Sequence, residues 1–263
     1  AGAVSGVPFT TQPVVQIRDA GGNLTTSTAS VTATIATGTG TLAGTVTVNA
    51  VNGVATFTTL QLNGSGAHTL TFSSTGLTSA TSTSIGVTQS PASLSIQTQP
   101  AGAVTGVAFT TQPVVRVLDN AGLVVTTGPG ATLSIAATIN SGSGTLSGTL
   151  SEAAVNGVAT FTTLAITGFG PHTLQFATST PSLSVNSAAL SVAAGPPTTI
   201  ASNSATPQTA NAGTAVAAPP SVKVTDAGGN PVAGVNVVFA VTSGGGATSP
   251  ASPATVATNA LGV

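Results

Sequence analysis

An internal repeat with a period of about 100 residues is the feature that most constrains the fold of this chain. Residues 1–15 recur as residues 101–115 with two substitutions, and residues 51–60 recur as residues 155–164 without change. A repeat of this length corresponds to one immunoglobulin-like domain rather than to a short solenoid unit. The sequence therefore predicts domains arranged in tandem.

The two copies differ in length by an insertion. Asp119 follows Asp19 by 100 residues, whereas the matching Asn-Gly steps farther along the chain lie 104 residues apart. Four residues are therefore added in the second copy, near Pro129 or near Glu152.

A turn with the sequence Asp-Ala-Gly-Gly-Asn begins at Asp19 and again at Asp226, and a degenerate copy begins at Asp119. An aspartate accepts hydrogen bonds from backbone N–H groups of the following residues, and glycine supplies a positive φ, so the motif predicts a structural turn. Calcium is the alternative, but it takes about six to eight oxygen ligands, including several carboxylates. One acid per turn cannot supply them, so we expect no metal site.

Short segments with alternating apolar residues, separated by glycine-rich turns, predict β-strands throughout. No segment shows the 3.6-residue period of a helix. The fold class predicted is all-β, with tandem immunoglobulin-like β-sandwich domains. In the first repeat the expected strands cover residues 14–18, 31–35, 45–48, 54–58, 68–72 and 82–88.

Two proline-containing linkers divide the chain into three expected domains. Residues 1–90 form a first domain that is expected to lack its opening strand, and residues 91–194 form a complete domain. Residues 195–263 form a third domain that stops at a position matching Asn52-Gly53 and is expected to lack its closing strands. Either the chain is a mature or excised part of a longer array, or a neighbouring subunit supplies the missing strands.

The composition excludes several classes of function. Only 3% of residues are charged, with a net charge of -1, against about a quarter charged in an average soluble protein. No basic patch for nucleic acid or a membrane surface can form. The chain has no cysteine, and no apolar stretch reaches the roughly 20 residues of a membrane helix. We expect no cofactor, no nucleic acid partner and no membrane insertion within this segment.

The stretch from Val222 to Phe239, which reads Val-Lys-Val-Thr-Asp-Ala-Gly-Gly-Asn-Pro-Val-Ala-Gly-Val-Asn-Val-Val-Phe, resembles the bacterial immunoglobulin-like domains of intimins and invasins. The resemblance covers residues 198–263, and the two preceding repeats are looser relatives that lack the Asn-Pro-Val-Ala-Gly continuation. It implies an extracellular or bacterial cell-surface location and a role as a stalk or spacer, often in adhesins.

Each of the first two repeats contains one histidine, followed by two apolar residues on the same strand face. His68 precedes Leu70 and Phe72, and His172 occupies the matching position. Immunoglobulin-like folds often place a tyrosine at this corner, where it bonds back to the chain, and a histidine can do the same. With one histidine and no cysteine per repeat, we expect a structural corner and neither a catalytic nor a metal site.

Most phenylalanines fall in strand patterns and are expected in the core, but Phe169 lies in a Gly-Phe-Gly-Pro loop. Phe169 is therefore a candidate contact residue. The function predicted is a non-enzymatic extracellular structural protein, a stalk or self-assembling fibre that associates with itself or with further domains of a longer chain. Strand exchange between subunits is the specific hypothesis. The alternative is an adhesin module that binds a host or carbohydrate ligand.

Overall fold

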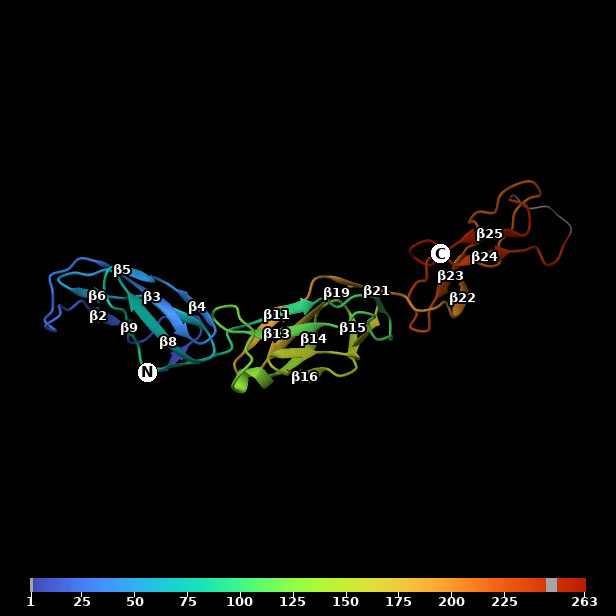
Figure 1. Ribbon diagram of the computed structural model, residues 1–263. Coiled ribbons are helices and arrows are strands. Elements are labelled where there is room, and N and C mark those ends of the chain that lie inside the picture. Colours follow the sequence, from blue (N-terminus) through green and yellow to red (C-terminus); the bar gives the residue numbers. More distant parts are fainter. Residues whose placement is uncertain (1, 245–249) are drawn as a thin grey trace.

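The computed structural model describes residues 2–244 and 250–263. Figure 1 shows its strands in three groups that follow one another in an extended row, coloured blue to cyan, green to yellow, and orange to red. The described residues form 25 strands and one short 3-10 helix. The predicted all-β class is confirmed.

Residues 91–194 fold into two facing layers. One is a six-stranded sheet in the order β12-β21-β19-β14-β16, with β20 paired to β19. The other contains the three-stranded sheet β11-β13-β17 and the pair β15-β18. The strands are β11 (Ser93–Thr98), β12 (Ala103–Val104), β13 (Val114–Leu118), β14 (Ser134–Ser141), β15 (Gly144–Ser147), β16 (Ser151–Ala153), β17 (Val158–Thr160), β18 (Ala165–Gly168), β19 (Gly170–Thr178), β20 (Leu183–Asn186) and β21 (Leu190–Ala193).

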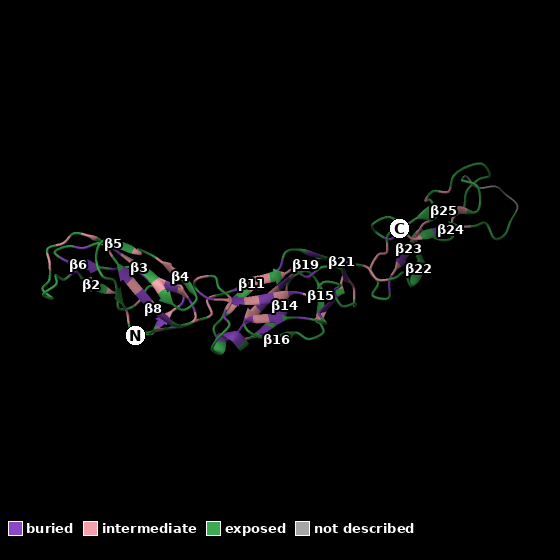
Figure 2. Ribbon diagram, viewed as in Figure 1, coloured by how far each residue is buried: buried purple, intermediate pink, exposed green. Residues whose placement is uncertain are grey.

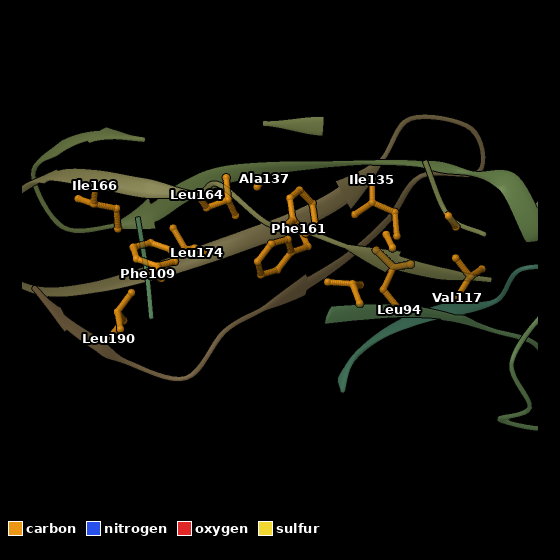
Figure 3. Close-up of a cluster of buried hydrophobic side chains, with 14 of the residues drawn as sticks. Leu94, Phe109, Val117, Ile135, Ala137, Phe161, Leu164, Ile166, Leu174 and Leu190 are labelled. Atoms are coloured by element: carbon orange, nitrogen blue, oxygen red, sulfur yellow. The ribbon is translucent and has the colours of Figure 1, made fainter. Parts of the chain in front are cut away.

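The core of this sandwich lies between the layers (Figure 3), where strand alternation sends every second side chain inward. Phe161 and Phe176 are fully buried, with ring centroids 5.3 Å apart in a tilted arrangement. Phe57 and Phe72 repeat this pair in the first repeat at 5.5 Å. The two cores are separate clusters of buried side chains.

Residues 1–90 repeat the architecture with one difference. The larger sheet has the order β1-β10-β8-β3-β5, with β9 paired to β8, and the facing layer holds the pairs β2-β6 and β4-β7. Within the described residues, no strand takes the place beside β2 that β11 takes beside β13. The strands are β1 (Ala3–Val4), β2 (Val14–Gln16), β3 (Ser30–Thr37), β4 (Gly40–Ala43), β5 (Thr47–Asn49), β6 (Val54–Thr56), β7 (Gln61–Gly64), β8 (Gly66–Ser73), β9 (Ala80–Thr81) and β10 (Ile85–Thr88).

Residues 195–263 contain two antiparallel pairs, β22 (Thr199–Ser202) with β23 (Val222–Thr225) and β24 (Asn236–Phe239) with β25 (Ala254–Ala257). In Figure 2 most of this segment is coloured green for exposed residues, whereas the strands of the second repeat carry more purple for buried ones. A hollow of about 220 Å³ opens between the pairs and is lined by apolar residues that include Val222, Val237 and Phe239.

The structure decides where the four-residue insertion lies. Val31 pairs with Val48, and Ile135 pairs with Glu152, so Glu152 keeps its spacing to the preceding strand. The added residues lie between Val125 and Ala131, because Gly157 N bonds to Ala131 O as Gly53 N bonds to Ser27 O, and Val125 N bonds to Val117 O as Thr25 N bonds to Ile17 O. The 3-10 helix η1 (Pro129–Thr132) begins within this segment, and the first repeat has no such helix among its described residues. The alternative near Pro129 is therefore the correct one.

The Asn-Gly steps form tight turns, but they do not close simple hairpins. Asn52 and Gly53 have φ angles of 50° and 76°, and Val51 and Val54 exchange backbone hydrogen bonds across them. The flanking strands then separate, because β5 pairs with β3 in one layer and β6 pairs with β2 in the other. The turn thus carries the chain from one sheet to the facing sheet.

Several predicted strands begin or end elsewhere in the structure. β2 ends at Gln16 rather than at residue 18, and four strands (β1, β4, β7 and β9) were not predicted. Each of these four contains glycine or is only two residues long, which weakens the alternation that reveals a strand. In the described part of the chain, no helix is long and apolar enough to cross a membrane.

Candidate functional site

The three aspartate turns have the same internal geometry. In the first, Asp19 Oδ1 accepts hydrogen bonds from the backbone N–H groups of Gly21 and Asn23, both at 2.9 Å. The backbone closes the turn, because Asp19 N donates to Asn23 O at 3.0 Å and Gly22 N donates to Asp19 O at 3.0 Å. The turn satisfies its own polar groups without any ligand.

The other two copies repeat these bonds at the same distances. Asp119 Oδ1 accepts from the N–H groups of Ala121 and Leu123 at 2.9 Å. Asp226 Oδ1 accepts from those of Gly228 and Asn230, also at 2.9 Å. What differs is exposure: Asp19 is exposed, whereas Asp119 and Asp226 are 2% and 3% exposed.

The burial of Asp119 arises at the junction between the first two repeats. Gln89, at the end of the first repeat, donates through Nε2 to Asp119 Oδ2 at 3.2 Å and to Val124 O at 2.9 Å. Its Oε1 accepts from the backbone N–H of Thr126 at 2.9 Å. One amide side chain therefore joins the end of the first repeat to the first turn of the second.

Gly6 brings the backbones of the two repeats together at the same junction. Its φ is 73°, and a Cβ placed on it would lie 2.3 Å from the backbone N of Ala121. Only glycine can adopt this conformation at this distance without moving the Asp119 turn. Gly106 is the matching residue of the second repeat; its φ is 72°, and an added Cβ would meet only a methyl carbon of Thr167, at 4.0 Å.

The junction that follows the second repeat also ends on an aspartate turn. Asp226 Oδ2 accepts from the backbone N–H of Gly195 at 2.8 Å and from Asn230 Nδ2 at 3.0 Å. The linker backbone here takes the part that the Gln89 side chain takes at the first junction. In both cases the second carboxylate oxygen of a repeated turn receives a donor from the segment before it.

Hydrogen bonding lowers the pKa of the carboxyl group in two of the turns. Burial raises the pKa of Asp226, but bonds from the Asn230 side chain, from Gly195 N and from the turn itself outweigh it, so the net pKa is lowered. The pKa of Asp19 is lowered mainly by bonds from the backbone and side chain of Asn23. Both groups are therefore held in the carboxylate form that the turn requires.

Each histidine lies inside its sandwich and faces two carbonyl oxygens. His68 Nε2 is 2.9 Å from Thr39 O and Nδ1 is 3.1 Å from Gly66 O. His172 makes the same contacts with Ser143 O at 2.8 Å and Gly170 O at 3.0 Å. Both histidines are 1% exposed. Each ring thus joins the start of its own strand, β8 or β19, to the loop before β4 or β15, and its hydrogen-bond partners in the described structure are carbonyl oxygens.

Phe169 lies between β18 and β19 and is 41% exposed, the only exposed phenylalanine among the described residues. Among the described residues, no hydrogen bond or aromatic pair connects Phe169 to an aspartate turn. The residues that sequence reasoning missed are Gly6, Gln89 and Gly195. Gly6 and its equivalent are visible in the repeat, but nothing in the sequence marks Gln89 as a residue that crosses the junction.

In the described part of the chain, no group of three or more His, Cys, Asp or Glu residues is close enough to hold a metal ion. The aspartate turns lie in separate repeats, and the histidines lie in separate cores. What the aspartate turns do in the described structure is bond to the segment that precedes them, at Asp119 and at Asp226.

No family model matches this chain, and no curated protein matches it. Among solved structures, the D0-D1 domain of intimin matches at 16% identity over 73% of this chain and 94% of that chain, with a TM-score of 0.27. Invasin, a bacterial integrin-binding protein, matches at 17% identity over 77% of this chain and 40% of the invasin chain, with a TM-score of 0.34.

Domains 5-6 of the S-layer protein SbsC match at 17% identity over 73% of this chain and 93% of that chain, with a TM-score of 0.24. Intimin and invasin are the proteins whose immunoglobulin-like domains the sequence of residues 198–263 resembles. At these identities and TM-scores, the three matches do not assign a function to this chain.

Proposed function

We propose that this chain is a non-enzymatic structural protein of a bacterial surface or extracellular matrix, a stalk or self-assembling fibre of immunoglobulin-like domains. The proposed domains are residues 1–90, 91–194 and 195–263. The mechanism is mechanical: sandwiches placed in series hold a fixed distance, provided that the junctions between them resist bending.

The observation that carries this proposal is the repeated use of the aspartate turn at the junctions. Asp119 receives the Gln89 side chain, and Asp226 receives the Gly195 backbone. A buried carboxylate with hydrogen-bond donors from two successive segments resists bending, because bending would remove the donor that the preceding segment supplies. A repeated motif used at both junctions is what a spacer of many domains requires.

The ionisable groups support a structural role. Three of the four acidic residues form turns, and both histidines hold loops inside the sandwiches. A catalytic acid or base needs a free proton-transfer position facing a substrate. These five side chains are engaged with the backbone instead.

Low charge and open strand edges support self-association. A net charge of -1 gives little repulsion between copies. The larger sheets of the first and second repeats end in β5 and β16, whose outer edges are unpaired within the described residues, and unpaired edges favour strand addition. The extracellular location rests on the resemblance of residues 198–263 to surface-protein domains.

Two measurements test the spacer. Backbone relaxation by NMR should show residues 2–90 and 91–194 tumbling as one elongated body, and small-angle scattering should give a rod rather than a flexible pair of spheres. Electron microscopy of concentrated protein should show filaments or lateral bundles. Independent tumbling of the two repeats would contradict the spacer, and dispersed monomers at all concentrations would contradict the assembly.

An adhesin module is a second candidate, favoured by the exposure of Phe169 at a loop tip. A ligand that stacks on this ring would bind there, and Phe169→Ala should then weaken binding to a host-glycan or matrix-protein array by about tenfold, as for loss of one aromatic contact worth about 1–2 kcal/mol. Unchanged binding by the variant would remove this candidate.

A further inference from the structure

The larger sheets of the first two repeats end in strands whose outer edges have no partner within the described residues. β5 is last in the order β1-β10-β8-β3-β5, and β16 is last in the order β12-β21-β19-β14-β16. Figure 1 shows β5 at the upper margin of the first group of strands and β16 at the lower margin of the second. Each edge strand lies in the interior of its repeat, so the edge is a property of the fold that both repeats share.

The hydrogen bonds around β5 show which of its backbone groups face outward. Val46 O accepts a hydrogen bond from β3 at 2.8 Å, and Ala50 N donates to the residue before β3 at 3.0 Å. Bonded positions alternate along an antiparallel strand, so Val48, midway between these two, also bonds toward β3. The N–H and C=O groups of Thr47 and Asn49 therefore face the open edge, where they form a template for another strand.

β16 has the same edge but a different residue at its centre. Glu152 lies opposite Ile135, as Val48 lies opposite Val31. Ile135 and Val31 are both buried in the cores of their repeats, so both central side chains lie on the core side of the sheet. Val48 packs against the core of the first repeat. Glu152 places a carboxylate there, and it is the only acidic residue of the chain outside an aspartate turn.

This exchange of valine for glutamate changes what each edge can bind. An inward-pointing charge on an edge strand prevents sheets from pairing edge to edge. A second β16 paired with the first would bring two carboxylates directly opposite one another, which is destabilising. Residues 45–51 around β5 read Thr-Val-Thr-Val-Asn-Ala-Val, with no charged residue and no proline, and such β-branched segments favour strand pairing. The chain therefore blocks one edge and leaves the equivalent edge open.

We propose that β5 pairs antiparallel with β5 of a second copy of this protein, across a two-fold axis at Val48. Thr47 of each copy then lies opposite Asn49 of the other, and each of these two pairs exchanges two backbone hydrogen bonds. Val48 of one copy lies directly opposite Val48 of the other, without any charge between them. The occupant is a second copy because this register is self-complementary, as a two-fold contact requires. This inference rests on the proposed self-association and names the surface that performs it.

The size of the contact sets how it acts. β5 is three residues long, which is far below the extent of a stable interface, so the dimer is reversible and forms at high protein concentration. Where copies already lie side by side in a bundle, several such contacts act together and each strengthens the next. A covalent trap can capture the reversible pair.

A disulfide trap tests the register. The chain has no cysteine, so Thr47→Cys and Asn49→Cys each introduce the only thiol of their variant. A hydrogen-bonded antiparallel pair places its Cα atoms about 5.5 Å apart, within the range that a disulfide spans. Mixed as full-length proteins under mild oxidation, the two variants should give a heterodimer in about tenfold excess over either homodimer, because two copies of one position lie about 7–8 Å apart on the diagonal. A statistical mixture of the three dimers, an excess of a homodimer, or no dimer would overturn the proposal.

A charge at the centre of β5 should close this edge. Val48→Glu in both trap variants should lower the heterodimer yield about tenfold, because it places two carboxylates opposite each other. The same fold already accepts Glu152 at the matching position, so circular dichroism should show the variant folded. Thr81→Glu, exposed on β9 and separated from β5 by β8 and β3, adds the same charge and should leave the yield within about twofold. Equal effects of the two substitutions would contradict the edge contact.

Removal of the natural charge should open the second edge. Ser151 and Ala153 are the counterparts of Thr47 and Asn49. Ser151→Cys mixed with Ala153→Cys should trap little heterodimer, and about tenfold more when both variants also carry Glu152→Val. Equal trapping with and without Glu152→Val would show that the glutamate does not block the edge, and the contrast that supports the proposal would be lost.

The outcome is separable from that of the proposed function. If the β5 heterodimer does not form but filaments are seen by electron microscopy, the protein assembles through another surface and this inference alone fails. If neither is observed and the repeats tumble as one body, the chain is a spacer without this assembly contact, which also overturns the inference.

Discussion

The two junctions use the same turn but hold it in different ways. At the first, the Gln89 amide bonds to Asp119 and to two further backbone groups, while Gly6 places its backbone against Ala121. At the second, the Asp226 carboxylate takes one linker N–H, from Gly195. Ala194, the counterpart of Gln89, has no side-chain amide to contribute.

The difference shows that a repeated turn does not fix the stiffness of a junction by itself. The turn supplies a hydrogen-bond acceptor. The preceding segment determines how many donors bond to this acceptor and how much of its backbone packs against the turn. We therefore expect the first junction to be the stiffer one. Four experiments, in decreasing order of expected effect, can break or sharpen this comparison.

Gly6→Ala should have the largest effect. An alanine here would have to keep the left-handed backbone conformation of Gly6, and its Cβ would lie 2.3 Å from Ala121 N. Either the Asp119 turn would move or the junction would open. We expect a loss of about 2–5 kcal/mol in the free energy of unfolding, as a sum of backbone strain and overpacking. Denaturant unfolding of the full chain measures this loss.

Gly106→Ala is the matched control, since its φ of 72° imposes the same backbone strain but its Cβ has open space. It should cost only about 1–2 kcal/mol. If both variants lose the same free energy, the contact between Gly6 and the Asp119 turn does not stabilise the junction.

Gln89→Ala should cost about 1–3 kcal/mol, because it leaves the buried Asp119 Oδ2 without the amide donor. NMR relaxation should show the first two repeats reorienting more independently. Gln89→Glu keeps the shape but places a carboxylate beside Asp119, so it should be at least as destabilising at neutral pH. Rigid tumbling in both variants would show that the amide is not the connection.

Asp226→Asn should lower the free energy of unfolding by about 1–2 kcal/mol. An amide nitrogen in the place of Oδ2 is a donor and cannot accept the hydrogen bonds from Gly195 N and Asn230 Nδ2. Asp19→Asn is the control: its turn has the same internal bonds but is exposed and receives no linker donor in the described structure. Hydrogen exchange at the Gly195 amide should accelerate in Asp226→Asn only. Acceleration in both variants would contradict a specific junction bond.

Lowering the pH should have the smallest effect on stability of the four experiments. The pKa of Asp226 is lowered in the folded protein, so its contribution to stability is complete above the unfolded pKa and is lost as the pH falls through the lower folded value. Stability should therefore decline below about pH 4. Thermal unfolding between pH 6 and pH 3 should show a shallower decline for Asp226→Asn than for the parent. Equal slopes would show that Asp226 does not titrate differently in the two states.

Much of the fold could be predicted because it depends on local patterns. Alternation around Val31 and Leu70, the Asn52-Gly53 step and the aspartate turns are each encoded within a few residues. The strands that were missed are short or contain glycine, and β1 is defined only by its parallel pairing with β10. The junction residues were missed for a related reason: Gln89 lies 30 residues from Asp119, and no local pattern connects them.

By itself, the sequence determined the repeat, the all-β class and the chemistry of each turn, because these depend on residue spacing and on side chains that bond to their own neighbours. Only the tertiary structure decided which turns are buried and which strand edges are covered. Asp19, Asp119 and Asp226 make the same local bonds, yet only the latter two are shielded from water, because a preceding segment packs against them. Burial comes from long-range packing, which a short sequence motif does not contain.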